Sequence, residues 1–213
     1  MTPDILALLV EAAGVTAALG AVSIGAGLLL GFAVSAALLS RRRPLRGPAR
    51  LFVSFFRGVP LLVQLLLIYN VLPAVGVVLP GIAAAALGLT LCTAAYQAEN
   101  LRGGFLAVPP GLVEAAEVAG MSALQRFWRV RAPIAFKLTL PALVGEAIMV
   151  LKASSLVSVV GVVELTRTAQ DIAASTYRPL PVYAAAGALY VAVDWTLAGA
   201  GAALERRLRW GAA

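Results

Sequence analysis

Apolar residues gather into five long runs along the chain, and short stretches rich in arginine, proline or glycine separate the runs. A helix needs about 20 apolar residues to cross a hydrocarbon core that is about 30 Å thick. Each run is long enough, so the pattern predicts an all-α membrane protein with five transmembrane helices. We expect these spans at approximately residues 14–39, 51–73, 81–106, 138–163 and 182–204.

The overall composition supports a membrane protein without a separate soluble part. Hydrophobic residues make up 61% of the chain and charged residues 13%, against roughly 45–50% and about 25% in ordinary soluble domains. We therefore expect one transmembrane domain over residues 1–213. The first charges, Asp4 and Glu11, are acidic, unlike the basic start of a cleavable signal peptide, so we expect the first span to be retained.

The basic residues between the runs predict the orientation of the chain in the membrane. Residues 41–50, 126–137 and 206–209 hold five, four and three lysines or arginines, whereas residues 165–181 hold two. Cytoplasmic loops carry the excess of basic residues in membrane proteins. The N-terminus is therefore expected outside and the C-terminus inside, which five spans also require.

The residue inventory excludes several kinds of chemistry. The net charge of +7 comes with no interleaved aromatic residues, so it favours membrane topology over nucleic-acid binding. The chain has no histidine and a single cysteine, Cys92, so it has no disulfide, Cys/His zinc site or histidine-based catalysis. Lys152 with Ser154 and Ser155 is only a weak match to a serine–lysine hydrolase.

The loop at residues 109–137 contains a strong local signal. "PPGLVEAAEVAG" predicts a short helix, because proline is tolerated in a first turn and Gly120 can adopt the left-handed conformation that ends a helix. "SALQ" predicts a capping box between Ser122 and Gln125, and we expect Pro133 to end the second helix.

Two glutamates of the first short helix lie three residues apart and should repel each other weakly. These are Glu114 and Glu117, and Arg126 or Arg129 of the second helix could provide positive partners. A partner protein could do the same. Beside them, small side chains form a surface onto which such a partner could fit closely: Ala115, Ala116 and Ala119.

The same loop resembles a known family. "EAAEVAG", nine further residues and "VRAP" are similar to the cytoplasmic signature of ABC importer permeases, although Val130 and Ala132 replace the usual isoleucine and leucine. "FFRGVPLLVQL", "AYQAENLRGGFLAV" and "LKASSLVSVVGVVELTRTAQDIA" look like the polar amino acid branch of that family, whose members serve importers of histidine, glutamine, arginine or cystine. The resemblance implies a type I ABC importer permease fold.

The resemblance also implies the partners and the location. Two permease subunits, either two copies or this chain with a relative, would form the pathway in a bacterial cell membrane, with two ATPases and an extracytoplasmic binding protein. Neither Lys137 nor Lys152 follows a glycine, so we expect no phosphate-binding loop, no cofactor and no enzymatic activity in this chain. ATP and magnesium would bind to the partner ATPase. The residues expected to couple to that ATPase are Glu114, Ala115, Ala116, Glu117, Gly120 and Met121.

Ionisable residues inside apolar spans are costly and mark candidate functional sites. Glu99 and Arg102 are three residues apart and can pair with each other; Glu146 could also reach Arg102, and Arg57 is interpreted as an anchor that reaches the membrane interface. The family usually has an acidic or amide residue after the lysine that corresponds to Lys152, where this chain has alanine. The candidates for the substrate path are Glu99, Arg102, Glu146, Lys152, Ser154, Ser155 and Asp194.

The polar stretch between the last two spans is read in two ways. "ELTRTAQDIAASTYRPLP" fits either a solvated loop or, by the resemblance, a surface that meets the binding protein. The residues expected to dock that protein are Arg167, Gln170, Asp171 and Arg178.

An ion-coupled secondary transporter of small polar solutes is the alternative function. Such proteins are commonly built from internal repeats with broken helices at the substrate site. Five spans do not divide into two equal halves, which favours the permease subunit.

Overall fold

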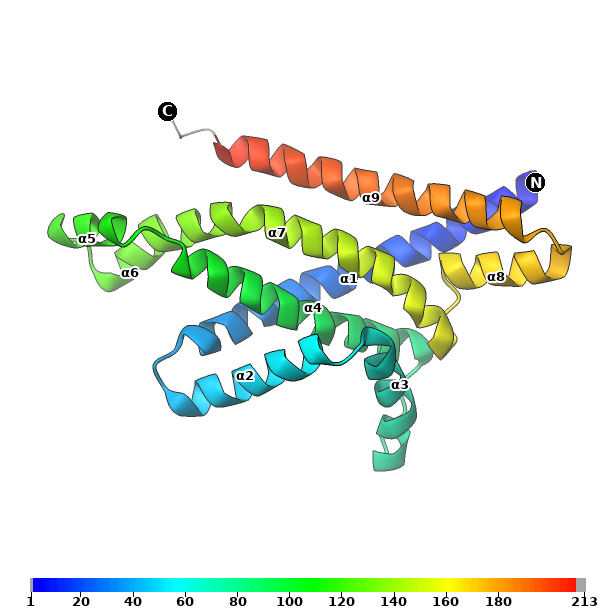
Figure 1. Cartoon of the computed structure of the whole chain (residues 1–213), viewed down its shortest axis with the longest axis horizontal. Coiled ribbons are helices and arrows are strands. Elements are labelled where there is room, and N and C mark those ends of the chain that lie inside the picture. Colours follow the sequence, from blue (N-terminus) through cyan, green and yellow to red (C-terminus); the bar gives the residue numbers. More distant parts are fainter. Residues whose placement is uncertain (1, 210–213) are drawn as a thin grey trace.

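The computed structural model describes residues 2–209, and Met1 and residues 210–213 of the expected domain lie outside the described part. Over residues 2–209 the chain is helical and contains no strand. The N-terminal and C-terminal ends of the described chain lie toward opposite ends of the long axis (Figure 1). The prediction of an all-α fold is confirmed for this part of the chain.

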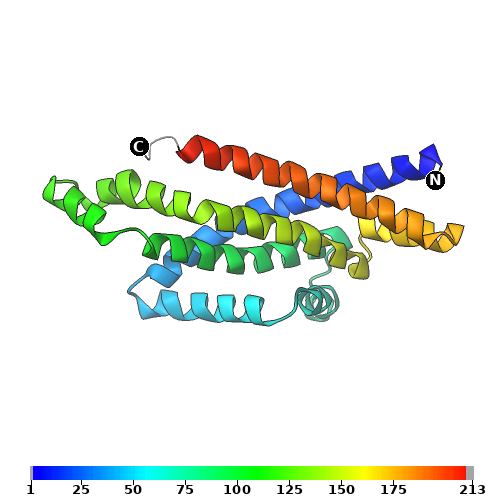
Figure 2. The same cartoon turned by 45° about the horizontal axis from the view of Figure 1, so that its top comes forward.

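Four long helices run along the molecule beside one another. They are α1 (Pro3–Leu39), α4 (Gly81–Leu106), α7 (Ala132–Ala153) and α9 (Pro179–Arg209). α1 packs along α4, α4 along α7, and α7 along α9 (Figures 1 and 2). α4 coincides with the third predicted span, whereas α1 and α9 extend beyond the first and fifth.

The helix at the fourth predicted span begins and ends at other residues than predicted. α7 begins at Ala132, before the predicted start at residue 138, and the α-helical part ends at Ala153. A 3-10 segment, η3 (Ser154–Val160), continues it and stops at Gly161, whose φ is +79°. Glycine accepts this left-handed conformation because it has no Cβ.

The second predicted span, at residues 51–73, contains a bend and is not one continuous helix. α2 (Arg43–Gly58) and α3 (Leu61–Val71) meet at a bend of 108°, and a short 3-10 segment, η1 (Leu72–Val75), follows α3. The cause is Pro60, which pushes the preceding residue out of the α conformation; Val59 is extended, with φ −95° and ψ 132°. Within residues 2–209, four helices are long and apolar enough to span a membrane, and the number of spans is five if the bent pair counts as one.

Gln64 stabilises this bend. Its Nε2 donates to the carbonyl of Phe56 at 2.9 Å and to that of Val59 at 2.7 Å. The last carbonyls of a helix have no partner within the helix. The buried Gln64 amide supplies two of the missing bonds, so it fixes the corner between α2 and α3.

The short helices of the loop fold largely as predicted. α5 (Pro110–Val118) ends at a turn in which Gly120 has φ +78°. Ser122 and Gln125 form the expected capping box at the start of α6 (Ala123–Arg126). Pro133 does not end the second helix, because a π-helical segment, η2 (Phe127–Arg131), leads directly into α7. The π-helical turn directly before Pro133 is a local adjustment of the kind by which membrane helices tolerate a proline.

Small residues allow the central helices to approach closely. A Cβ added to Gly27 would lie 2.7 Å from the Thr93 side chain, and one added to Gly31 would lie 3.0 Å from the carbonyl of Ala94. Gly104 of α4 packs in the same way against Thr139 of α7. Close backbone approach of this kind is the usual basis of helix association in membranes.

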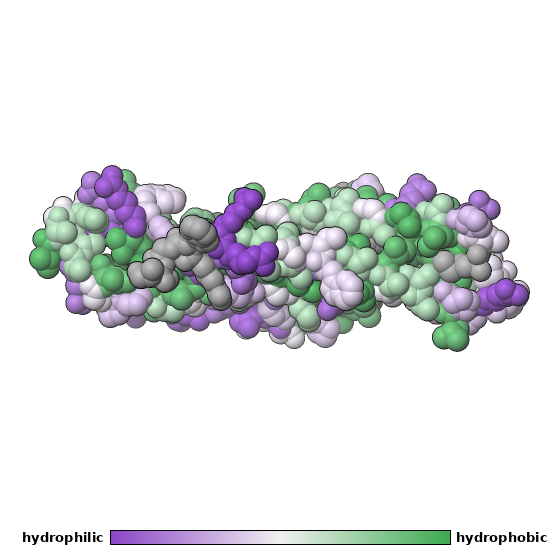
Figure 3. Space-filling model, turned by 90° about the horizontal axis from the view of Figure 1, so that it is seen from above, coloured by the Kyte–Doolittle hydropathy of each residue, from purple (hydrophilic) through white to green (hydrophobic). Residues whose placement is uncertain are grey.

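The surface is divided along the long axis. In the view from above, hydrophilic residues gather toward the two ends and near the C-terminal end of α9, and apolar residues cover much of the stretch between them (Figure 3). α8 (Leu165–Thr176) lies at the end that carries the start of α1, and α5 and α6 lie at the opposite end (Figure 1). On this face, apolar residues therefore separate the two polar ends.

Candidate functional site

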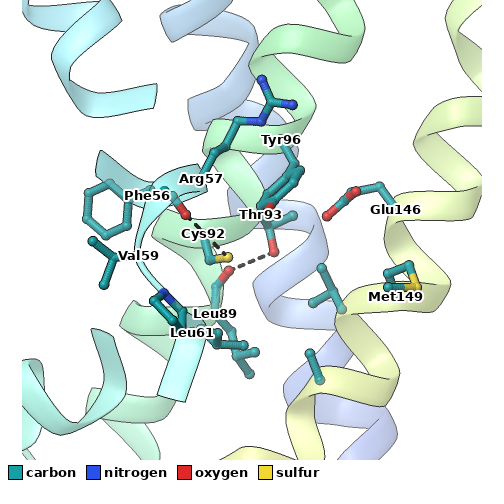
Figure 4. Close-up of a pocket in the computed structure, with 14 residues that line it drawn as sticks. Phe56, Arg57, Val59, Leu61, Leu89, Cys92, Thr93, Tyr96, Glu146 and Met149 are labelled. Carbon is teal, nitrogen blue, oxygen red and sulfur yellow. Dashed lines mark hydrogen bonds between the residues drawn. The ribbon is translucent and has the colours of Figure 1, made fainter. Parts of the chain in front are cut away.

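A cavity of about 390 Å³ lies where the corner between α2 and α3 faces α4 and α7 (Figure 4). Its apolar wall comes from all four helices, through Phe56, Leu61, Leu89, Met149 and Val150. Its polar and ionisable lining consists of Arg57, Cys92, Thr93, Tyr96 and Glu146. An apolar cavity with a few convergent polar groups is the usual form of a small-molecule site.

Arg57 belongs to this cavity. Its guanidinium lies 5.1 Å from the centre of the Tyr96 ring, within the roughly 6 Å over which a cation is attracted to an aromatic face. The sequence suggested an interface anchor for Arg57, which stays a prediction, and the structure adds an aromatic partner on α4. Because α2 ends at Gly58, the side chain of Arg57 is carried at the corner and not in the middle of a span.

Glu146 is the acidic group of the cavity. It extends from α7 toward Tyr96 and Thr93 of α4 (Figure 4). Among residues 2–208 no lysine or arginine side chain lies within 4.0 Å of its carboxylate. The suggested contact with Arg102 is absent there, because Arg102 Nε and Nη2 donate to Glu99 Oε2 at 2.9 and 2.6 Å. The expected pairing of Glu99 with Arg102 is confirmed.

Two other polar groups of the cavity bond to backbone. Thr93 Oγ1 donates to the carbonyl of Leu89 at 2.6 Å, and the Cys92 thiol points to the carbonyl of Phe56 at 3.9 Å (Figure 4). These groups are therefore occupied within their own helices or corner. Arg57 and Glu146 remain as the ionic groups that a solute in the cavity would meet.

The remaining ionisable candidates lie elsewhere. Lys152 Nζ is 3.6 Å from Asp194 Oδ2, which joins α7 to α9; the lysine side chain is 57% exposed and the aspartate 13%. The Ser154 hydroxyl donates to the carbonyl of Leu151 at 2.6 Å, and the carbonyl of Ser155 accepts from the Ser158 hydroxyl at 2.9 Å. Of the seven expected substrate-path residues, Glu146 alone lines this cavity.

The expected coupling residues lie together on α5 and its turn. Glu114, Ala115 and Gly120 are exposed. Glu117 Oε1 accepts from Arg126 Nη1 at 2.8 Å, which is one of the pairings the sequence suggested.

Ala116 differs from the sequence expectation of an outward-facing small surface. Its side chain is 7% exposed, so it packs inside the helix pair, whereas Ala115 and Ala119 face outward. Met121 is half-buried, and its backbone N–H donates to the carbonyl of Ala116 at 3.0 Å. Ala116 therefore helps to set the turn and does not form part of the exposed face.

The expected docking residues for a binding protein lie on one exposed helix and its end. Arg167, Gln170 and Asp171 are exposed on α8, and Arg178 follows the helix. Arg167 Nε donates to Asp171 Oδ2 at 3.3 Å. These side chains are available to a partner at the end of the molecule that carries the start of α1 (Figure 2).

A buried carboxylate beneath α8 was not among the sequence candidates. Glu164 is 0% exposed and caps α8, accepting from the backbone N–H groups of Thr166 at 2.9 Å and Arg167 at 2.8 Å. It also accepts from the Tyr190 hydroxyl at 2.9 Å and the Thr16 hydroxyl at 3.4 Å. The only sequence signal is an acidic residue just before a polar helix, which does not reveal its burial.

The Glu164 cluster serves structure and not metal binding. It joins α8 to α1 through Thr16 and to α9 through Tyr190, and the Thr16 hydroxyl also accepts from the backbone N–H of Leu165 at 3.1 Å. No group of three or more acidic, cysteine or histidine side chains that could hold a metal ion occurs in residues 2–209.

The molecule combines long apolar helices, a cavity with a few polar and ionisable groups, and a helix pair that protrudes at one end. This combination is typical of a multi-pass transport subunit that another protein can engage. Comparison with known proteins agrees. Residues 23–210 match the binding-protein-dependent transport system inner membrane component, and the chain belongs to this family. The predicted importer permease is thereby confirmed.

The similar relatives and solved structures belong to transporters of amino acids and related compounds. The octopine transport system permease protein OccM of Rhizobium meliloti is 39% identical over 196 residues, covering 86% of this chain and 78% of OccM. The arginine transport system permease protein ArtQ of Bacillus subtilis is 35% identical over 202 residues, 94% of this chain and 92% of ArtQ. A crystal structure of an amino acid ABC transporter with histidines matches with a TM-score of 0.87 and 37% identity, covering 97% of this chain and all of that one. The MetNI methionine ABC transporter shares the fold, with a TM-score of 0.84 at 23% identity.

Proposed function

We propose that this chain is the permease subunit of an ATP-driven importer for polar amino acids, with one transmembrane domain over residues 1–213. The bent pair α2 and α3 counts as one of five spans, with the N-terminus outside and the C-terminus in the cytoplasm of a bacterium. The excess of basic residues near α2, α6 and the end of α9 supports this orientation.

The cavity between α2, α4 and α7 carries the proposal. Arg57 and Glu146 present opposite charges to the same space of about 390 Å³. A free amino acid has a carboxylate and an ammonium group, so it can pair with both charges at once. Ionisable groups inside a membrane protein are retained where they meet a pathway or a partner. The cavity therefore suits a small zwitterion that leaves water while crossing.

The other ionisable groups have supporting roles in this proposal. Glu99 with Arg102 and Lys152 with Asp194 would line the path outside the cavity, where paired charges cost less to bury than single ones. Ser154 and Ser155 would contribute small hydroxyl-bearing surface beside Lys152. On the outer face, Arg167, Gln170, Asp171 and Arg178 would receive the binding protein.

Energy would enter through α5. Two separate ATPase subunits would bind ATP and magnesium, close on each other and move α5 through contacts with Glu114, Ala115 and Glu117, which are exposed. The turn at Gly120 and Met121 would pass that movement to α6 and α7. This chain would catalyse no reaction and hold no cofactor. The second permease subunit would be another copy or a related chain.

The test is ATP-dependent uptake by proteoliposomes that contain the permease, its ATPase and its binding protein. We expect Arg57→Gln and Glu146→Gln each to lower the maximal rate by about 10-fold to 100-fold, since each removes a charge-assisted hydrogen bond worth roughly 1.5–3 kcal/mol. Arg50→Gln, two turns earlier on α2, and Glu205→Gln on α9 are matched controls outside the cavity. Both controls should transport at the wild-type rate.

The outcomes test the cavity and the ATP-driven mechanism separately. Wild-type rates in Arg57→Gln and Glu146→Gln would show that the cavity is not part of the substrate path. ATP-independent uptake by the permease alone, driven by an ion gradient, would favour a secondary transporter and overturn the importer. Stimulation of ATP hydrolysis by the loaded binding protein distinguishes the two cases directly.

A further inference from the structure

A second cavity, of about 520 Å³, lies at the end of the bundle that carries the arginines and away from the cavity described above. Its wall is apolar and comes from three elements: Phe32 and Leu39 of α1, Phe105 and Leu106 of α4, and Phe127 of η2. Ala36 of α1 also lines the groove, and Ser40 and Arg131 are its polar members. We call this space the Arg131 groove.

The apolar wall of the groove is exposed on the outside of the helix bundle. Phe32 is 47% exposed and Leu106 61% exposed, so the groove opens sideways from the bundle. Phe105 and Phe127 stack at its base with ring centres 5.8 Å apart. A concave, aromatic-lined wall on a membrane helix bundle is suited to hold hydrocarbon and not water.

The rim of the groove is positive. Within residues 2–209, Arg131 has no carboxylate within 4.0 Å, unlike the nearby Arg126, which pairs with Glu117. Arg41 and Arg42 follow Ser40 directly, and the backbone N–H of Arg42 donates to Ser40 Oγ at 3.1 Å. The sequence between Glu11 and Glu99 contains no acidic residue that could neutralise these arginines locally. The groove therefore combines an apolar wall with a cationic edge at the end of two long helices.

We propose that the Arg131 groove binds one anionic phospholipid, whose acyl chains lie against α1, α4 and η2 and whose phosphate meets Arg131 and the arginines after Ser40. Charge complementarity selects this occupant, because a zwitterionic lipid would add a positive group beside the arginines. Basic clusters next to membrane helices attract anionic headgroups by about 1 kcal/mol for each lysine or arginine. The groove adjoins η2, which connects the coupling helices to α7, so the lipid would contact the segment that transmits movement.

A third cavity in the same molecule provides an internal comparison. It is about 470 Å³ in volume and lies between α1 and α4, lined by Val15, Ala18, Leu19, Val22, Ile82, Ala83 and Ala86. It has no ionisable residue. Acyl chains can fill it, but it has no means to select a headgroup.

The test is native mass spectrometry of the complete transporter, released from detergent that contains equal amounts of phosphatidylglycerol and phosphatidylcholine. The wild type should retain one phosphatidylglycerol for each copy of this chain. Arg131→Gln should lower the ratio of retained phosphatidylglycerol to phosphatidylcholine about fivefold. Arg129→Gln, two residues away and outside the lining, should keep the wild-type ratio.

A second pair of variants tests the shape of the groove. Ala36 is exposed and lines the groove, so Ala36→Phe should fill it and abolish selective retention. Ala18→Phe makes the same change on the same helix in the third cavity and should leave selectivity unchanged.

Three results would overturn the proposal. Wild-type selectivity in both Arg131→Gln and Ala36→Phe would exclude the groove as the lipid site. Displacement of phosphatidylglycerol by an excess of inorganic phosphate would indicate a site for free phosphate. Loss of complex assembly in Ala36→Phe but not in Ala18→Phe would indicate that another protein chain, and not a lipid, occupies the groove.

Discussion

The two ends of the molecule hold their charged residues in opposite ways. At one end Glu164 is fully buried and accepts hydrogen bonds from groups on α1, α8 and α9. At the other end α5 projects with exposed glutamates, and its ion pair to α6 joins a 21% exposed Arg126 to a 65% exposed Glu117. Buried, charge-assisted bonds are strong and costly to break, whereas exposed ion pairs contribute about 0–1 kcal/mol.

This difference indicates how the two ends can behave. The Glu164 cluster ties three helices into one unit, because none of them can move without leaving a buried carboxylate or hydroxyl unsatisfied. α5 is attached by covalent turns, by the buried Ala116 and by Val113, which packs against the cluster of Phe105, Val108 and Ala135, and the rest of its surface is exposed to a partner. The fixed end suits a docking platform and the lightly attached end suits a moving contact.

Removing the carboxylate should have the largest effect. Glu164→Ala leaves two backbone N–H groups and the Tyr190 hydroxyl without their acceptor, whereas the Thr16 hydroxyl can still donate to the carbonyl of Ala12, and we expect a loss of about 3–5 kcal/mol in stability. The melting temperature of the purified complex in detergent measures it. Gln170→Ala, exposed on the same helix, is the control and should melt like the wild type. An equal melting temperature for both variants would mean that the cluster adds nothing to stability.

The packing of α5 provides the next test. Ala116→Glu forces a charged side chain into a site that is 7% exposed, and it should disorder the helix pair at a cost of about 2–3 kcal/mol. Ala115→Glu adds the same side chain on the exposed face, so the helix pair should stay intact while stimulated ATP hydrolysis falls. Hydrogen exchange over residues 110–131 separates the two effects. Equal protection in both variants would contradict the assigned burial.

A single hydroxyl of the Glu164 cluster should matter less than the carboxylate. Tyr190→Phe keeps the ring and removes one donor to Glu164, which should cost about 1–1.5 kcal/mol. Tyr183→Phe on the same helix, where the side chain is exposed, should have no measurable effect. Thermal melts of the two variants make the comparison, and an unchanged Tyr190→Phe would mean that Glu164 is held without α9.

The ion pair of α5 should have the smallest effect on stability. Glu117→Gln should lower it by less than about 1 kcal/mol, because the glutamate is mostly solvated. The effect should shrink further at high salt. A shift in melting temperature as large as that of Glu164→Ala would show that the two ends are equally fixed.

Features that depend on local sequence were predictable. The third span, the turn at Gly120 and the capping box of Ser122 each follow from a few neighbouring residues, and the structure has them where expected. The bend after Gly58 also has a local cause, the proline at position 60, but the long apolar run around it favoured the prediction of one straight span. The ends of the spans were harder to predict, because helices continue through ionisable residues, such as Asp4 and Glu11 in α1 and Lys137 in α7.

Contacts between distant segments could not be predicted in the same way. Lys152 meets Asp194, and Arg57 meets Tyr96, because α7 packs on α9 and the α2 corner packs on α4. Nothing in the spacing of one helix fixes its rotation against another. Glu164 shows the same limit, since its burial depends on Thr16, which lies 148 residues earlier in the chain.

The amide of Gln64 gives the cavity lined by Arg57 and Glu146 a property of its own. Both carbonyls that it engages, on Phe56 and Val59, belong to residues of the cavity wall, although Gln64 itself is not part of that wall. Hydrogen bonds from a residue outside the lining therefore hold this part of the cavity wall in place. If the helices move to open the cavity to the other side of the membrane, a solute would still meet the same shape at the corner between α2 and α3. Only its route out of the cavity would change.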